Sequence, residues 1–282
     1  MRVVFATDLS DANEAAIRSR TCLDCLDNIG VTKVHLVTVV PDNVSSGLPG
    51  MDTAADARKA LKPQREVFES AGFAVETHVA RGTPHRRITG FADRLDADMV
   101  IVGSRGESAL SNRLVGSTTR NVARTTRRPL LVERIAPPES DKAVVKEHLF
   151  EHVLVATDFS ENARRAFEYL PRLEGATQAV DLLYVKSGKS QTSVSDATAQ
   201  LEDLAVEVKS EMGIEAGISV REGDPAEEIR AEETRVDATT TLLGTRGQSP
   251  LRRLLLGSVS ESVVARGNNN VLLIPPGAAR GR

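Results

Sequence analysis

The sequence predicts an α/β protein built from two tandem doubly wound domains, and three observations support this prediction. The chain has 282 residues, which is longer than one ordinary domain of about 100–200 residues. Two segments of the first half return in the second half. Within each half, short strands rich in Val, Ile and Leu alternate with segments of helical periodicity. This alternation is typical of a parallel sheet with helices on both faces.

The repeat joins two stretches of each half. Residues 3–10 (VVFATDLS) return as residues 153–160 (VLVATDFS), at an offset of 150. Residues 103–117 (GSRGESALSNRLVGS) return as residues 244–258 (GTRGQSPLRRLLLGS), at an offset of 141. The period of about 140 residues predicts two copies of one domain rather than a solenoid.

The expected boundaries follow from the repeat and from local composition. We expect a first domain at residues 1–135, a linker at 136–148, a second domain at 149–276 and a tail at 277–282. The linker contains two adjacent prolines and a charged run, which are typical of a connecting segment.

The first copy contains five expected strands and four expected helices. The strands are short apolar runs at Val3–Ala6, Lys33–Val39, Ala74–Val79, Met99–Val102 and Leu130–Arg134. The helices have apolar residues at helical spacing and lie at Asn13–Leu26, Asp52–Ala71, Pro84–Leu95 and Ser117–Arg127. Pro63 falls inside the second helix, where its missing N–H predicts a kink or a restart.

The second copy repeats this order. Its expected strands are His152–Ala156, Val180–Val185, Ile214–Val220, Thr241–Leu243 and Val271–Ile274. Its expected helices are Ala163–Leu173, Ser193–Met212, Pro225–Arg235 and Gly257–Arg266. Each copy is therefore predicted to form its own parallel sheet.

Composition excludes several classes of function. The formal net charge of −3 and the pI of about 6.0 give no electrostatic basis for nucleic-acid binding. Aromatic residues make up 3% of the chain and Trp is absent, which argues against base-stacking surfaces. No run approaches the roughly 18 apolar residues of a membrane span.

The two cysteines, Cys22 and Cys25, are expected to pack in the hydrophobic core, and a redox or metal role is the alternative. A location in the reducing cytoplasm is expected.

The repeated glycine motif, G-x-x-G-x9-G-[ST], falls where parallel sheets bind ligands. Its first glycine, Gly103 or Gly244, ends the fourth strand, and its last pair opens the next helix. Ligands of such sheets bind beyond the carboxyl ends of the strands. Glycines allow the backbone to approach closely, and a helix N-terminus offers N–H donors and a positive dipole end to an anion. The motif predicts a phosphate site, and ordinary loop and helix capping is the competing interpretation.

These features resemble the universal stress protein family in its tandem form. The resemblance rests on the A-T-D start of each copy, the Gly-x-Pro turns at residues 82–84 and 223–225, and the glycine motif before the last strand, and it covers nearly the whole chain. It implies five-stranded sheets of order 3-2-1-4-5 and membership of the ATP-binding branch. It also implies that the fifth strands, Leu130–Arg134 and Val271–Ile274, pair within the chain as a pseudo-dimer. A homodimer of chains and an unidentified protein partner stay open.

The resemblance further implies roles for individual residues. Asp8 and Asp158 would lie near the ribose or a divalent metal, and Val39 and Val185 would lie against the adenine. The phosphates would be held by Gly103, Gly106, Gly116, Ser117, Thr118, Gly244, Gly247, Gly257, Ser258 and Val259. The expected ligand is ATP, or ADP or AMP, with Mg²⁺ or Mn²⁺. For the aspartates, capping of the following helix is the alternative role.

The pattern favours binding over catalysis. We expect an adenine-nucleotide-binding regulatory protein of the stress response, with neither nucleic-acid nor membrane partners. The chain has no Walker lysine motif, and no repeated His, Lys or Glu accompanies the glycines as a general base. The first alternative is a slow ATPase, or a phosphotransferase that modifies its own Ser117 or Ser258. The second is an interaction scaffold without a ligand.

Three other polar positions are weaker candidates. Arg105 and Arg246 share one position of the motif, where phosphate contact and solvent exposure are both open. The second copy has Asp181 in place of His35 and no histidine in place of His85. Structural or solvated roles are therefore expected for these two histidines.

Overall fold

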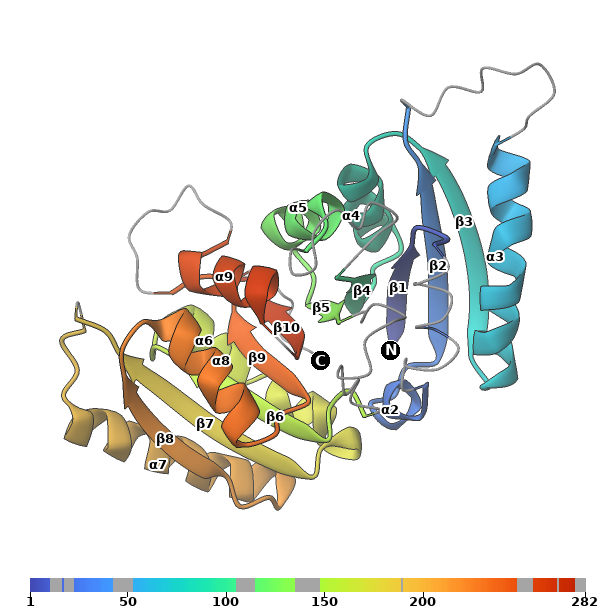
Figure 1. Ribbon diagram of the computed structural model, residues 1–282. Helices are drawn as coiled ribbons and strands as arrows, with labels where there is room; N and C mark the ends of the chain where they lie inside the picture. The colour runs from blue at the N-terminus through green and yellow to red at the C-terminus, as the bar shows by residue number, and fades with distance from the viewer. Residues whose placement is uncertain are drawn as a thin grey trace. The chain divides into compact units, whose positions relative to one another are not determined.

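The computed structural model describes residues 1–10, 17, 23–42, 53–104, 115–134, 148–188, 190–247, 256–267 and 269–276 (Figure 1). The chain divides into two compact units, and the second begins at His148. We call them unit 1 and unit 2. Each carries one copy of the repeat, as the sequence predicts.

Unit 1 is built on five parallel strands. They are β1 (Arg2–Thr7), β2 (Lys33–Val40), β3 (Ala74–Arg81), β4 (Met99–Gly103) and β5 (Leu130–Glu133). Their order across the unit is β3-β2-β1-β4-β5, and every neighbouring pair is parallel. The order reverses between β2 and β4, on either side of β1, so the carboxyl ends of β1 and β4 meet at the switch point of a doubly wound sheet.

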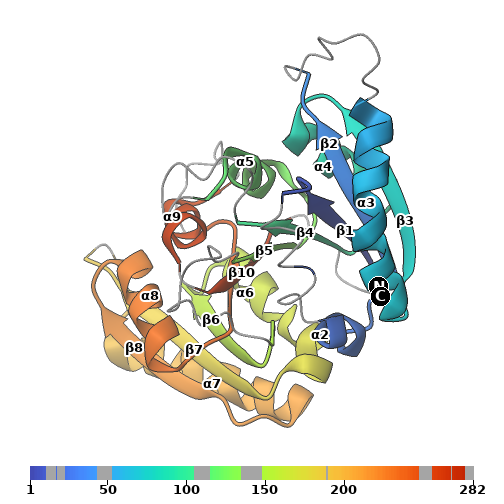
Figure 2. The ribbon, with the colours of Figure 1, turned by 45° about the vertical axis from the view of Figure 1, so that its right-hand side comes forward.

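Helices cover both faces of the unit 1 sheet (Figure 2). They are α2 (Leu23–Asn28), α3 (Thr53–Ser70), α4 (Pro84–Arg94) and α5 (Ser117–Thr125). Helix α3 lies on one face, and α4 and α5 lie together on the other (Figure 1). Phe5, Leu36 and Ile101 are fully buried between these layers, because strands covered on both faces cannot expose apolar side chains.

Unit 2 repeats the same arrangement. Its strands are β6 (His152–Thr157), β7 (Ala179–Lys186), β8 (Gly217–Glu222), β9 (Thr240–Gly244) and β10 (Asn270–Ile274). Their order is β10-β9-β6-β7-β8, again parallel between neighbours. The helices are α6 (Glu161–Phe167), the 3₁₀ helix η1 (Leu170–Ala176), α7 (Val194–Met212), α8 (Pro225–Arg235) and α9 (Ser258–Arg266). Helices α8 and α9 lie on the face opposite α7 (Figure 1).

The predicted fold class is confirmed in both units, and three local predictions need correction. The helix expected at Ala163–Leu173 is shorter and ends at Phe167, followed by η1, because Pro171 cannot donate the N–H that an α-helix requires. Pro63 does not restart α3, which continues through this residue as one helix. Leu61 before the proline and Phe68 after it are both buried. The third strand of unit 2 begins at Gly217, opposite Asp181, and not at residue 214. The helix expected at residues 13–26 lies mostly outside the described residues.

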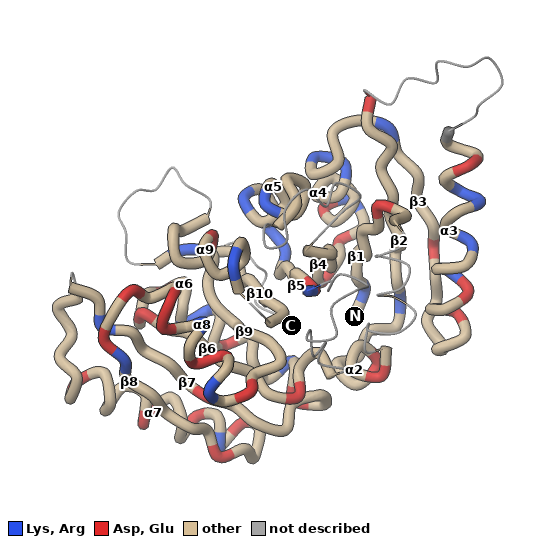
Figure 3. Tube along the Cα trace, viewed as in Figure 1, with Lys and Arg blue, Asp and Glu red and all other residues tan. Residues whose placement is uncertain are grey.

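Charges of both signs are interspersed along the helices, in agreement with the low net charge (Figure 3). On α3, Lys62 pairs with Glu66 at 3.7 Å and Arg65 pairs with Glu69 at 2.7 Å, each one helical turn apart. Within the described part of the chain, every helix is too short or too polar to cross a membrane.

Candidate functional site

The two ends of the glycine motif meet at the carboxyl end of the fourth strand in each unit. In unit 1, the Ser104 carbonyl accepts a hydrogen bond from the Gly116 N–H at 2.9 Å. In unit 2, the Thr245 carbonyl accepts from the Gly257 N–H at 2.7 Å. The structure therefore brings the last glycine of each motif back to the residue that follows its first glycine. Gly106 lies outside the described residues.

The helices α5 and α9 start directly at this junction. Their N-caps are Gly116 and Gly257, which have no side chain, and among the residues that the structure describes no side chain caps the first N–H groups of either helix. The next residues, Ser117 and Ser258, are exposed at the first helical position. Uncapped N–H donors at the positive end of a helix dipole form an anion site. Thr118 and Val259 follow in the same turn and are half-buried.

Two buried hydroxyls that the sequence analysis missed attach these helices to the strands. Thr119 donates a hydrogen bond to the Gly103 carbonyl at 2.7 Å, and Ser260 donates to the Gly244 carbonyl at 2.8 Å. Both side chains are about 4% exposed. A hydroxyl residue recurs at this third helical position in both copies, which was the available sequence signal.

The aspartates occupy equivalent turns after the first strand of each unit. The Asp8 carboxylate accepts from the backbone N–H of Ser10 at 3.1 Å, and Asp158 accepts from Ser160 at 3.0 Å. The intervening residues, Leu9 and Phe159, have positive φ angles of 62° and 59°. The two turns therefore have the same hydrogen bond and the same positive φ, as expected for equivalent positions of a duplicated domain. In unit 2, Ser160 and not Asp158 caps α6, so the capping role considered for this aspartate is wrong.

The unit 2 aspartate lies beside the second glycine of the motif. A Cβ placed on Gly247 would come within 2.5 Å of Asp158 Oδ2. A Cβ on Gly244 would collide with the amide of Asn162 on α6. Close approach to the Asn162 backbone thus requires a glycine at position 244, whereas at Gly247 the neighbouring atom belongs to a side chain that can move. The structure brings three predicted site residues, Asp158, Gly244 and Gly247, to one sheet end.

Val39 and Val185 lie near the carboxyl ends of β2 and β7, the second strands of their units. Val39 is opposite Ala80 on β3, and Val185 is opposite Arg221 on β8. Both side chains are half-buried. Both lie at the carboxyl edge of their sheets, the edge that also bears the aspartates and the glycine motifs.

Unit 2 holds buried polar atoms without a partner in the part of the chain that the structure describes. Three of them, Thr245 Oγ1, Arg246 Nε and Asn162 Oδ1, lie near the carboxyl end of β9. Thr245 and Arg246 directly follow Gly244, and Asn162 packs against that glycine. A buried polar group without a partner costs about 1–3 kcal/mol, and such groups mark places where a ligand or water completes the hydrogen bonding. A polar ligand or an ordered water at this sheet end would complete their hydrogen bonding.

The geometry defines a class of protein: a duplicated α/β fold in which a glycine motif links the carboxyl end of the fourth strand to the start of the next helix in each unit. The family model of the "Universal stress protein family" matches residues 1–134 and again residues 149–275. The chain therefore belongs to the universal stress protein family, with two family domains in tandem.

Three known proteins are similar to the chain in sequence or structure. A universal stress protein from Archaeoglobus fulgidus DSM 4304 has a crystal structure with a TM-score of 0.76 and 26% identity, covering 97% of this chain and 98% of its own. Universal stress protein G of Salmonella typhimurium is 32% identical over 142 residues, which are 46% of this chain and 93% of that protein. A universal stress protein crystallised in complex with cAMP is 25% identical, covers 48% of this chain and 98% of its own, and has a TM-score of 0.36.

Proposed function

We propose that this chain binds adenine nucleotides, with ATP as the principal ligand, at the carboxyl end of each sheet, and that occupancy regulates a partner in the stress response. The observation that carries the proposal is the uncapped start of α5 and α9 beside the strand-ending Gly103 and Gly244. Phosphates are the anions that such backbone sites bind.

Side chains around the site suit the rest of a nucleotide. The carboxylates of Asp8 and Asp158 are suited to a ribose hydroxyl or to a Mg²⁺ or Mn²⁺ ion that accompanies the phosphates. The half-buried Val39 and Val185 offer apolar contacts to the adenine. Among the described residues, Thr245 Oγ1 and Arg246 Nε have no hydrogen-bond partner, and both can donate a hydrogen bond to a phosphate oxygen.

The first test uses the purified full-length chain. With no Trp and two Tyr, the protein absorbs weakly near 280 nm, so a bound adenine would dominate its ultraviolet spectrum. Denaturation followed by chromatography identifies the released nucleotide and counts it per chain. After its removal, ATP, ADP, GTP and cAMP are titrated with Mg²⁺, and binding to the folded state raises the melting temperature.

Charge at the helix start separates binding from folding. Ser117→Glu and Ser258→Glu place a carboxylate at a helix N-terminus, where the helix dipole interacts favourably with negative charge. The same carboxylate would repel a bound phosphate. We expect unchanged melting temperatures without ligand and a loss of ATP affinity of about 10-fold or more in the altered unit. The matched Ser117→Gln and Ser258→Gln variants have similar side chains without charge and should retain binding. Full ATP affinity in the double glutamate variant would overturn the proposal, and a wild-type chain that ignores every nucleotide would favour the scaffold alternative.

Hydrolysis of the bound ATP is the competing proposal, favoured by the proximity of Asp158 to Gly247. Phosphate release by the wild type that disappears in the Asp8→Asn, Asp158→Asn double variant would support it. Unchanged turnover in that variant would assign the activity elsewhere.

A further inference from the structure

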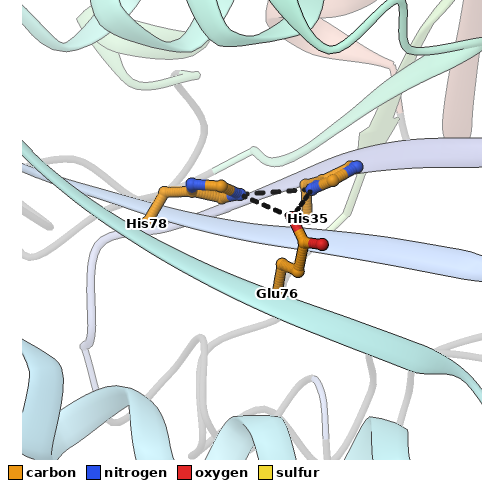
Figure 4. A group of neighbouring side chains, drawn as sticks. All are labelled: His35, Glu76 and His78. Atoms are coloured by element: carbon orange, nitrogen blue, oxygen red, sulfur yellow. Dashed lines mark hydrogen bonds and ion pairs between the residues drawn. The ribbon is translucent and has the colours of Figure 1, made fainter.

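A cluster of three metal-binding side chains lies in unit 1, away from the glycine motif. His35 comes from β2, and Glu76 and His78 come from β3. His35 Nδ1 lies 3.1 Å from His78 Nε2 and 3.4 Å from Glu76 Oε2. His78 Nε2 and Glu76 Oε2 are 4.0 Å apart. Figure 4 shows the three side chains converging on one point between the strands.

The strand register explains this convergence. His35 is directly opposite Glu76, and the residue two places further on, His78, lies on the same face of β3 because strand side chains alternate. The sequence signal was therefore E-T-H at residues 76–78 beside a histidine on the neighbouring strand. The expectation of a merely structural or solvated His35 did not include this pairing, since strand register is not visible in the sequence.

The cluster opens to solvent on one side and is sealed on the other. The side chain of His35 is 3% exposed, that of His78 is 20% exposed and that of Glu76 is 51% exposed. The ring of Phe91 on α4 packs on His78, with the ring centroids 5.0 Å apart.

Neighbouring cations leave one carboxylate oxygen directed at the histidines. Lys33 Nζ pairs with Glu76 Oε1 at 2.7 Å, whereas Oε2 is the oxygen near both rings. Arg2 on β1 and Arg94 on α4 add positive charge at longer range. These cations weaken the attraction for a metal ion, so the ion must be one that bonds strongly to imidazole.

The spacing of the three atoms fits a tetrahedral zinc ion. Zinc bonds to His nitrogen and carboxylate oxygen at about 2.0–2.2 Å, which places tetrahedral ligand atoms about 3.3–3.6 Å from one another. The three observed separations, 3.1, 3.4 and 4.0 Å, bracket that range. Two imidazoles and one carboxylate form a known zinc ligand set that leaves a fourth position for water.

We propose that His35, Glu76 and His78 form a Zn²⁺ site that joins β2 to the edge strand β3 of unit 1. The site is independent of the proposed nucleotide site, since His35 lies four residues before Val39, which is about 13 Å along an extended strand.

Unit 2 provides an internal control. Its strands β7 and β8 pair in the same register, with Asp181 opposite Gly217, and the equivalents of the three ligands are Asp181, Gly217 and Ser219. Unit 2 therefore has neither histidine at these positions. The proposal predicts one zinc per chain.

The experiment measures zinc bound to the full-length chain, free of any purification tag and stripped of nucleotide. Wild type is dialysed against Zn²⁺ or Mg²⁺ and the metal is counted by mass spectrometry. Zinc titration gives the affinity, and Co²⁺ substitution reports tetrahedral coordination through its visible absorption. The variants are Glu76→Gln and His78→Gln, which alter the more exposed ligands, and the matched control is His85→Gln, a histidine on α4 outside the cluster.

We expect one Zn²⁺ and no retained Mg²⁺ in the wild type and in His85→Gln, with affinity about 100-fold lower in Glu76→Gln and His78→Gln, since even second-shell partners of metal ligands contribute about 10–100-fold. Circular dichroism checks that the variants are folded. A wild type that retains no zinc would show that the histidines only hydrogen-bond to each other and would overturn the proposal. Equal zinc in wild type and both ligand variants would also overturn it. The Ser117→Glu, Ser258→Glu chain should still bind zinc, which separates this result from that of nucleotide binding.

Discussion

The buried carboxylate of Glu232 makes the acid stability of unit 2 predictable. Glu232 lies on α8 and its side chain is 2% exposed. Arg235 donates to it at 2.6 Å and 2.9 Å, and Arg221 on β8 donates at 2.9 Å and 3.2 Å. The perturbation is Glu232→Gln, which retains the shape of the side chain and removes its charge.

The hydrogen bonds from Arg235 above all, and then those from Ser219 and Arg221, lower the pKa of Glu232 to about 2. Each pKa unit corresponds to about 1.4 kcal/mol, so the shift from an ordinary glutamate corresponds to about 3 kcal/mol. Solvent screens the partly exposed guanidinium groups, whose side chains are 39% and 51% exposed, and we reduce the expected contribution to about 2 kcal/mol.

The sign of the pH dependence follows from the direction of the shift. Because the pKa is lower in the folded than in the unfolded state, the contribution is complete above the ordinary glutamate pKa and disappears as the pH falls toward about 2. Glu232→Gln should therefore lower the free energy of unfolding by about 2 kcal/mol at pH 7, with a smaller difference near pH 3.

Urea unfolding of the full-length chain, followed by circular dichroism at pH 7 and near pH 3, measures both values. Glu202→Gln is the matched control, since Glu202 is an exposed glutamate on α7 of the same unit. It should change the free energy of unfolding by no more than a few tenths of a kcal/mol. An equal destabilisation by Glu232→Gln at both pH values, or none at pH 7, would refute the reasoning.

Two further predictions use the duplicated elements. Asp224 caps α8 with hydrogen bonds of 3.0 and 3.1 Å, whereas Thr83 at the start of α4 makes no such bond. Asp224→Ala should cost about 1 kcal/mol in urea unfolding and Thr83→Ala much less, and equal losses would contradict the capping argument. Thr119→Val removes the buried hydrogen bond to the Gly103 carbonyl and should cost about 1–2 kcal/mol. Thr118→Val, which copies the natural Val259 of unit 2, is its control and should unfold like the wild type.

Periodicity and repetition were sufficient to predict the fold class, whereas the strand order followed from the family resemblance. Apolar runs predicted the strands because residues buried on both faces of a parallel sheet leave a continuous hydrophobic signal. The effect of proline on a helix was less predictable: α6 ends at Phe167, before Pro171, whereas α3 continues through Pro63. Tertiary packing decides whether a helix continues past a proline or stops before it.

The glycine motif identified the region of the candidate site, while its supporting contacts could not be foreseen. Gly103 and Gly244 were recognisable as candidate site residues in the sequence because each ends a short apolar run and begins the repeated motif. The hydroxyl of Thr119 looks ordinary in the sequence, and its role appears only when the helix start lies against the Gly103 carbonyl. Whether the fifth strands pair within the chain stays a prediction.

Duplication has left the two units alike at one end of the sheet and different beneath one helix. The carboxyl ends retain matching Asp turns, glycines and helix starts, as expected if both bind the same kind of ligand. In unit 2, Glu232 on the helix after the third strand forms ion pairs with arginines. The equivalent residue of unit 1 is Phe91, whose ring packs on His78. One helix position thus supports a charged network in one unit and the wall of a histidine cluster in the other. A fold requires only that each buried polar group has a partner there, so this position was able to become Glu232 in one unit and Phe91 in the other.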